Sequence, residues 1–258
     1  MRGESLDAVE VVETGLLGDR AYALLDRSSG HVVRAKRPNR WRGILDWDAS
    51  FREPPTPGGD LPPVDIVPPD GGAPLGSDDP DRLECVTSEA FGQAVHLESV
   101  PPPAATFEYH RPDLEAVGRP GEITEHGTLP GTFFDSASVL VLTTTSLAHF
   151  ESLVPGSRFD VARFRPNVLI EPNEGSGFVE NEWVGGVLAL GDRARLRVTA
   201  PCMRCVMVNL GQGELEPDRR ILKSVFAHND GNAGMKTEVE ATGRVAVGDD
   251  VRFHPATE

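Results

Sequence analysis

Proline and glycine divide this chain into short segments, and this division constrains the fold more than any other feature. The sequence contains 22 prolines and 27 glycines among 258 residues. Because proline interrupts helices and both residues mark turns, this spacing favours short strands over long helices. The sequence therefore predicts a mainly β protein of the α+β class, with β-barrel structure covered by a few helices.

The first half of the chain contains several apolar runs of strand length. The segment Arg27–Gly30 is rich in serine and glycine, which is typical of the turn of a β-hairpin. The strands expected here are Ser5–Val12, Ala21–Asp26, His31–Ala35, Arg40–Trp47 and Val95–Val100. We expect this half to form a first, β-barrel-like domain over residues 1–100.

Residues 54–80 interrupt the strand pattern. Nine prolines and five glycines fall there among aspartates, with almost nothing apolar to bury. This composition predicts a mobile surface insertion. Asp79-Pro80 then has the pattern of an N-cap followed by proline at the first helical position, so we expect a helix that ends at Gly92. Cys85 lies within this helix and is expected to be a small buried residue.

The second half repeats the pattern of short strands and adds two helices. Thr144 or Thr145 is expected to cap a helix that runs to Leu153. Pro217 is expected to open another helix, on which Ile221, Leu222, Val225 and Phe226 form one apolar stripe. The expected strands are Val139–Thr143, Asn167–Ile170, Val187–Leu190, Ala194–Thr199, Val206–Leu210, Thr237–Ala241 and Val245–Phe253, and Gly191-Asp192 is expected to form a tight hairpin turn between two of them. A linker is expected between residues 101 and 112, followed by a second domain over residues 114–255.

Charge and cysteine usage exclude some partners and favour one compartment. The formal net charge is −15, which argues against nucleic acid or an anionic membrane surface as a partner. Residues 1–12 are polar and no apolar run is long enough to span a bilayer. Three cysteines are an odd number, which fits a reducing compartment better than a secreted disulfide framework. We therefore expect a cytoplasmic protein.

Two of the three cysteines form the C-x-x-C pair Cys202–Cys205. Structural zinc or an iron–sulfur cluster normally needs four ligands, and the sequence offers no second pair. A thioredoxin-type dithiol lies at a helix N-terminus, whereas the pair here precedes an expected strand. Two interpretations remain: two buried thiols without a chemical role, or one thiolate that binds a soft metal. Arg204 would favour a thiolate at its neighbour Cys205, although the spacing does not choose between the two cysteines.

Basic residues gather in two segments of this acidic chain. Arg163 and Arg165 precede the strand Asn167–Ile170, which is expected to be buried, and Arg204 lies between the two cysteines. Arginine suits phosphate, and asparagine suits the edge of a heterocycle. Although a solvated surface is the ordinary explanation for any one of them, together they indicate a pocket for a phosphorylated heterocyclic cofactor with a metal near a thiolate.

These segments resemble, in order, the MOSC domain, which is named after the C-terminal part of molybdenum cofactor sulfurases. The motifs are Phe164-Arg165-Pro166-Asn167, Asn181-Glu182-Trp183, Leu190-Gly191-Asp192 and Cys202-Met203-Arg204-Cys205, with support from Phe134–Ser138 and Val247–Val251. The first half, through Gly15–Arg20 and the hairpin after it, resembles the β-barrel domain that precedes the MOSC domain. This two-domain arrangement is similar to the mitochondrial amidoxime-reducing component and its bacterial relatives.

The resemblance implies a molybdenum cofactor, a pyranopterin phosphate that carries molybdenum. It implies that Cys205 is the metal ligand and the catalytic residue. The cofactor contacts that it implies are Arg20, Asp135, Ser136, Ala137, Arg165, Asn167, Met203, Arg204 and Cys205. Met203 stands where a small polar residue is usual, which would remove one hydrogen bond. The family also begins with a strand that ends in a lysine and a serine; this strand is missing before Arg2, so we expect either a start upstream of Met1 or weaker cofactor binding.

The resemblance further implies an oxidoreductase that reduces N-hydroxylated or N-oxidised small molecules. Since no flavin, haem or iron–sulfur signature is present in the sequence, electrons are expected from a separate partner protein. Two alternatives stay open. The first is a cofactor carrier or sulfur-transfer adaptor without turnover, and the second is a protein that has kept the fold but lost the cofactor.

Overall fold

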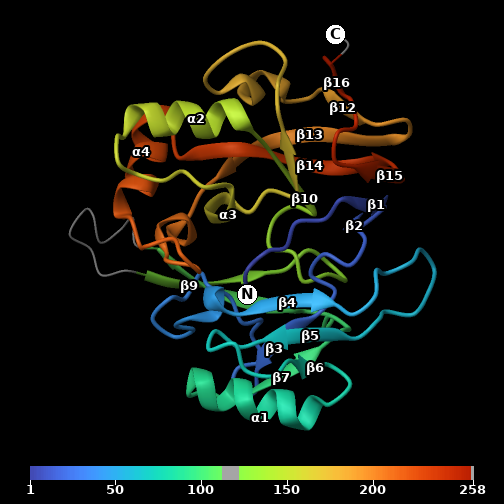
Figure 1. Cartoon of the computed structure of the whole chain (residues 1–258), viewed down its shortest axis with the longest axis vertical. Coiled ribbons are helices and arrows are strands. Elements are labelled where there is room, and N and C mark those ends of the chain that lie inside the picture. Colours follow the sequence, from blue (N-terminus) through green and yellow to red (C-terminus); the bar gives the residue numbers. More distant parts are fainter. Residues whose placement is uncertain (112–121, 257–258) are drawn as a thin grey trace. The chain divides into compact units, whose positions relative to one another are not determined.

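The computed structural model describes residues 1–111 and 122–256, and the described chain is mostly β with four α-helices (Figure 1). This confirms the predicted fold class. The chain forms two compact units, each built from separate stretches of sequence. The first unit comprises Met1–Glu4, Arg20–Ser136 and Gly211–Glu216, and the second comprises Ser5–Asp19, Ala137–Leu210 and Pro217–Glu258.

These units do not follow the predicted domains 1–100 and 114–255. The chain leaves the main segment of the first unit only at Ser136. Residues 106–111 of the expected linker form strand β8 (Thr106–Arg111), which pairs antiparallel with β9 (Glu122–Gly127). The expected linker is therefore wrong over this stretch, because these residues belong to a hairpin of the first unit. Residues 112 and 114 lie outside the described residues.

The first unit contains three small antiparallel arrangements, β3–β7, β4–β5–β6 and β8–β9. Helix α1 begins after Asp79, whose side chain accepts a hydrogen bond from Arg82 N, and it ends at Gly92 with a φ of 62°. Both ends confirm the sequence prediction. The remaining elements are β3 (Ala23–Asp26), the 3-10 helix η1 (Ile44–Asp46), β4 (Asp48–Phe51), β5 (Val64–Val67), β6 (Leu75–Gly76), α1 (Pro80–Phe91) and β7 (Val95–Glu98).

The proline-rich stretch 54–80 is not the insertion without a core that its composition predicted. It supplies β5 and β6, and Val64, Ile66 and Leu75 are buried there. Prolines stand in pairs on both sides of Val64–Val67 and none interrupts it, so the ladder of β5 keeps its donors. The alternation of Val64 and Ile66 with polar residues was the strand signal that the proline count concealed.

Three further predictions for the first unit need correction. The expected strand Arg40–Trp47 is instead a turn and a 3-10 helix, because Gly43 adopts a φ of 72° and the apolar side chains there recur at helical spacing. The expected strand His31–Ala35 is reduced to a single β-bridge at Val32. Cys85 is exposed on α1 rather than buried.

The second unit is organised around a six-stranded mixed sheet in the order β11-β10-β14-β13-β12-β16. Strand β11 runs parallel to β10, and the other neighbours are antiparallel. Strand β1 pairs with β2 and β15 in a second, smaller sheet. The strands are β1 (Ala8–Val12), β2 (Gly15–Leu16), β10 (Val139–Thr143), β11 (Val168–Ile170), β12 (Val187–Leu190), β13 (Ala194–Met203), β14 (Asn232–Ala241), β15 (Gly243–Ala246) and β16 (Val251–His254).

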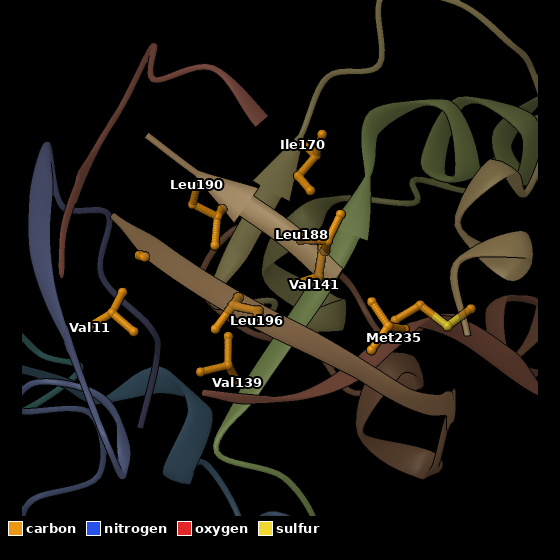
Figure 2. Close-up of a cluster of buried hydrophobic side chains, with 10 residues drawn as sticks. Val11, Val139, Val141, Ile170, Leu188, Leu190, Leu196 and Met235 are labelled. Carbon is orange, nitrogen blue, oxygen red and sulfur yellow. The ribbon is translucent and has the colours of Figure 1, made fainter. Parts of the chain in front are cut away.

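Branched aliphatic side chains fill the core of this unit. Figure 2 shows side chains from β1, β10, β11, β12, β13 and β14 converging on one cluster. The labelled members are Val11, Val139, Val141, Ile170, Leu188, Leu190, Leu196 and Met235. Gly191 has a φ of 53° in the predicted hairpin between β12 and β13, which confirms that turn. Burial of these side chains is the main force that holds the sheet together.

The helices of the second unit pack around a separate cluster of stacked phenylalanines, which includes Phe150, Phe159 and Phe164. Helix α2 begins after Thr143, one residue before the earlier of the two expected caps, and α4 begins after Asp218. On α4 the expected apolar stripe is only partly buried, because Phe226 is 44% exposed. These elements are α2 (Thr144–Leu153), α3 (Val161–Phe164), the 3-10 helices η3 (Val179–Trp183) and η4 (Val206–Asn209), and α4 (Arg219–Asn229).

Within the described residues, none of the helices has the length and apolar character needed to cross a membrane.

Candidate metal and cofactor site

The cysteine pair lies where the longest strands of the second unit end. Strand β13 continues past the expected end at Thr199 and includes Cys202. Its register with β14 shifts three times, and two of the shifts lie close to the cysteines, between Val198 and Ala200 and between Pro201 and Met203. Such β-bulges bend a strand and redirect its side chains, and they are common beside functional sites. The C-x-x-C segment therefore occupies an irregular strand end rather than a plain loop.

The expected strand Val206–Leu210 is wrong, since Val206–Asn209 form the 3-10 helix η4 directly after Cys205. Val208 is fully buried among the phenylalanines, and the guanidinium of Arg163 donates to the carbonyl oxygens of Val208 and Leu210 at 3.4 and 3.0 Å. The two carbonyl groups are thus bonded to an arginine instead of to a neighbouring strand, and the apolar composition of the segment did not reveal this. A thioredoxin-type pair is nevertheless excluded, because a helix of four residues has too small a dipole to lower the pKa of a thiol.

Arg204 contacts Cys202 rather than its neighbour Cys205. Its Nη1 donates to Cys202 Sγ at 3.3 Å, and its Nη2 donates to the carbonyl oxygen of Phe164. The guanidinium carbon also lies 5.5 Å from the centroid of the Phe164 ring. The expectation that Arg204 acts on the sulfur of Cys205 is therefore wrong, because the side chain turns back toward α3. Its Nε is buried and has no hydrogen-bond partner in the described residues.

Cys205 is a free, partly buried thiol. No group of three or more histidine, cysteine, aspartate or glutamate side chains among the described residues could hold a metal ion. A metal at Cys205 would thus have at most one further ligand of these residue types among the described residues, and a cofactor would supply the rest. One or two thiolates fit a metal that arrives inside an organic cofactor, and the buried Nε of Arg204 is a further donor in the same segment.

The chain takes an unusual backbone conformation at Arg165. This residue ends α3 with a φ of 53°, and its N–H donates to Val161 O at 2.9 Å. In the described residues only Arg20, Arg165 and Asp230 combine a side chain with a positive φ. This conformation costs about 1 kcal/mol or more and is concentrated at functional sites. Two of the three residues are therefore arginines that the sequence singled out as cofactor contacts.

Asn167 has a structural role that the sequence did not predict. Its Oδ1 accepts from Leu140 N at 2.9 Å, and its Nδ2 donates to Asp19 Oδ2 at 2.7 Å. Its backbone N–H donates to Leu140 O at 2.8 Å. The side chain thus fixes the start of β11 against β10. The strand itself is an edge strand with Leu169 44% exposed, so the expectation of a buried strand after Arg165-Pro166-Asn167 is wrong.

We expect Asn167→Ala to lower the free energy of unfolding of the cofactor-free protein by about 1–3 kcal/mol, because a partly buried donor and acceptor lose their partner. Chemical denaturation followed by circular dichroism would measure this. The exposed Asn173→Ala is the matched control and should change stability by less than about 0.5 kcal/mol. If Asn167→Ala is as stable as the control, the amide does not hold β11 in place.

Three of the other predicted contacts belong to the first unit. Arg20 Nη1 lies 3.9 Å from Asp135 Oδ1, and Lys36 forms an ion pair with the same carboxylate. Burial acts to raise the pKa of Asp135, but the charges of Lys36, Arg20 and Arg34 outweigh it and hold the pKa well below its usual range. Asp135 is therefore an ionised carboxylate paired with cationic side chains. Ser136, the next residue, is exposed.

The last two predicted contacts belong to the second unit. Ala137 is partly buried at the start of that unit's main segment. Met203 is 64% exposed at the end of β13. The structure thus brings Arg204 and Cys202 together, and it places Arg20 beside Asp135. Sequence reasoning missed Arg34, Lys36 and the carbonyl of Phe164; the first two carried no signal beyond their charge, and a backbone carbonyl carries none.

Residues 128–252 match the family described as the MOSC domain. None of the curated proteins matches the chain. Two solved structures are similar at a TM-score of 0.35. One, a "hypothetical protein", is 15% identical over 47% of this chain and 54% of its own length, so the chain spans about half of it. The other, YiiM from Geobacillus stearothermophilus, is 12% identical over 60% of this chain and 75% of its own. Similarity at this level supports no inference about function.

Proposed function

We propose, from the MOSC domain at residues 128–252, that this protein binds a molybdenum cofactor and that Cys205 is the protein ligand of the metal. The observation that carries the proposal is the difference between the two cysteines. Both are free, partly buried thiols at the irregular end of the sheet, but the guanidinium of Arg204 donates to the sulfur of Cys202 and not to that of Cys205. A thiolate is a soft ligand of the kind that such a metal prefers.

The arginines of this segment suit the anionic part of such a cofactor. Arg204 is held in place by Phe164 and Cys202, and its buried Nε remains as a donor. Arg165 ends α3 with a positive φ, which sets the direction in which its side chain leaves the backbone. Charge-assisted hydrogen bonds from fixed guanidinium groups favour phosphate binding. Asn167, Met203, Ala137, Arg20, Asp135 and Ser136 stay predicted contacts on the resemblance alone.

The proposed reaction is the reduction of an N-hydroxylated or N-oxidised small molecule. When bound, the cofactor supplies a metal that changes its oxidation state by two electrons. For an N-hydroxylated substrate the N–O bond breaks, two electrons and two protons are taken up, and the oxygen leaves as water. The electrons come from a separate donor protein. The protein chain binds and orients the cofactor, and Cys205 keeps the metal in place.

A second candidate is a protein of the same fold that binds the cofactor weakly, as a carrier, or no longer binds it. The commitment of the Asn167 side chain to Leu140 and Asp19 favours this candidate. The exposure of Met203, where a small polar residue is usual in the resembling family, favours it as well. Both features reduce the number of polar groups available to a pterin.

The test is the composition and activity of the protein purified from a host that makes the cofactor. We expect about one molybdenum atom per chain by elemental analysis, together with a pterin released on denaturation. With a chemical reductant this protein should reduce a simple amidoxime, and protein from a host that lacks cofactor synthesis should not. Zinc at this stoichiometry without pterin would refute the cofactor. A loaded protein that reduces no compound of a broad panel but transfers its cofactor to another apoenzyme would establish the carrier.

A further inference from the structure

We propose that the second unit binds a small multivalent oxyanion, a molecule with two or more phosphate or carboxylate groups, at one end of its six-stranded sheet. A pocket of about 790 Å³ lies there, lined by β12, β13, β15, β16 and the turns that join them in pairs. These strands gather at the end of the sheet that lies away from α4 (Figure 1). Since Arg195 in this pocket precedes Cys202 by seven positions on β13, the pocket lies about 20 Å from the cysteine pair.

Two arginines flank Ala189 on the outer face of the sheet. Leu188 and Leu190 belong to the buried core, so Ala189 between them faces outward. Its register partners are Arg195 on β13 and Arg252 on β16. Because adjacent strands lie about 4.8 Å apart, the Cα atoms of the two arginines are about 10 Å apart. The small alanine thus leaves a hollow between two cationic side chains, and a ligand with two anionic groups can contact both of them.

Neither of these two arginines is strongly neutralised by a carboxylate. The guanidinium of Arg195 is held by backbone carbonyl groups: its Nη1 donates to Ala194 O at 2.7 Å, and its Nη2 donates to Asp192 O at 3.3 Å. These bonds orient the group and leave its charge uncompensated. Arg252 lies 3.6 Å from Asp250, but the two side chains are 75% and 86% exposed, so this ion pair is weak. An incoming anion can therefore replace the carboxylate of Asp250 and bridge both arginines.

Two further arginines line the pocket, Arg193 and Arg244, and both are exposed. In the part of the chain that the structure describes, their guanidinium groups make no hydrogen bond or ion pair, and neither does the nearby carboxylate of Asp192. The carboxylate of Asp249 accepts from Ala246 N at 2.9 Å and thereby holds the turn between β15 and β16. In a chain of net charge −15, this pocket thus gathers guanidinium groups that its own carboxylates leave unpaired, which suits a ligand with several negative charges.

The test is calorimetric titration of tripolyphosphate, and separately of citrate, into the full chain at constant ionic strength. We expect saturable binding of at least one of them, and Arg195→Gln and Arg252→Gln should each weaken it about 10-fold, because each removes a charge-assisted hydrogen bond. If Arg195→Gln fails to fold, Arg252→Gln keeps the test open, since its side chain is 75% exposed. Arg197→Gln is the matched control: Arg197 lies two positions beyond Arg195 on β13 but pairs with Glu240 at 2.6 Å, so this variant should bind like the wild type.

Each outcome decides the proposal. Failure of the wild type to bind either anion, or equal affinity in the wild type and Arg252→Gln, would overturn it. Equal weakening by Arg252→Gln and Arg197→Gln would indicate unspecific attraction to surface charge and would overturn it as well. If the pocket binds as proposed, the tighter of the two anions identifies phosphate or carboxylate as the group that it prefers. The site uses neither Cys205 nor molybdenum, so its failure would leave the proposed function untouched, and absence of metal from the protein would leave this site untouched.

Discussion

Replacing Cys205 with serine should abolish molybdenum retention, whereas Cys202→Ser should leave most of the metal bound. Serine offers a harder oxygen that is a poor substitute for a thiolate. At Cys202, a serine oxygen can still accept from Arg204 Nη1, which lies 3.3 Å from the present sulfur. Loss of a supporting contact of this kind costs about 10–100-fold in metal affinity, far less than loss of the ligand itself.

Elemental analysis of the two variants, purified side by side from a cofactor-producing host, measures this difference. The matched control is Cys85→Ser, because Cys85 is exposed on α1 and should have no influence on the metal. Equal losses from Cys202→Ser and Cys205→Ser would indicate a paired role for the two thiols, such as a dithiol. Unchanged metal in Cys205→Ser would rule out a permanent bond from that residue.

Replacing Glu180 with alanine should lower the free energy of unfolding by about 3–5 kcal/mol, near the upper end for a single substitution. Glu180 is 1% exposed, and its carboxylate accepts from Thr143 Oγ1 at 2.7 Å and from Ser146 Oγ at 2.6 Å. Both hydroxyl groups are fully buried at the start of α2. The substitution leaves a cavity and two buried groups without their acceptor, and both effects destabilise.

Denaturant unfolding of three variants separates these effects. Glu180→Gln keeps the volume and one acceptor oxygen, so its loss should be smaller, about 1–2 kcal/mol. Glu182→Ala, on the exposed face of the same 3-10 helix, should change stability by less than about 0.5 kcal/mol. If Glu180→Ala unfolds at the same denaturant concentration as Glu182→Ala, the carboxylate does not support α2.

The elements that sequence reasoning found share a local cause. Helix α1 has its N-cap, its proline and its terminal glycine within thirteen residues of one another, and the hairpin at Gly191 depends on a turn of the same local kind. The errors have distant causes. Val206–Leu210 have the apolar, β-branched composition of a strand, but the guanidinium of Arg163, more than 40 residues earlier in the chain, binds the carbonyl groups of Val208 and Leu210. Pattern reasoning sees only neighbours in sequence, so contacts of this kind are beyond it.

At the candidate site, too, the residue types could be read from the sequence, whereas the contacts between them could not. The residue types of Cys202–Cys205 and of Arg165 could be singled out from the sequence, because a paired thiol and clustered arginines are rare in an acidic chain. The partners of Arg204 could not be predicted. Its position next to Cys205 in the sequence suggested a contact with that sulfur, but in the folded chain Arg204 donates to Cys202 Sγ and to the carbonyl oxygen of Phe164. Lys36 and Arg34 were missed because Asp135, the carboxylate on which both act, lies about 100 residues away in sequence and is close to them only in the folded chain.

The pairing of β1 with β15 has a consequence for how the protein is made. Val9 lies opposite Val245, so β1 is synthesised long before the strand with which it pairs. Contacts this distant in sequence slow folding. Until β15 is made, β1 has an unpaired edge that can pair with other chains and aggregate. The second unit also takes residues from three stretches of the chain, so no contiguous fragment contains it whole without the main segment of the first unit. We therefore expect this unit to acquire its native sheet only after synthesis of β15, and a chain truncated before Gly243 to accumulate as misfolded protein.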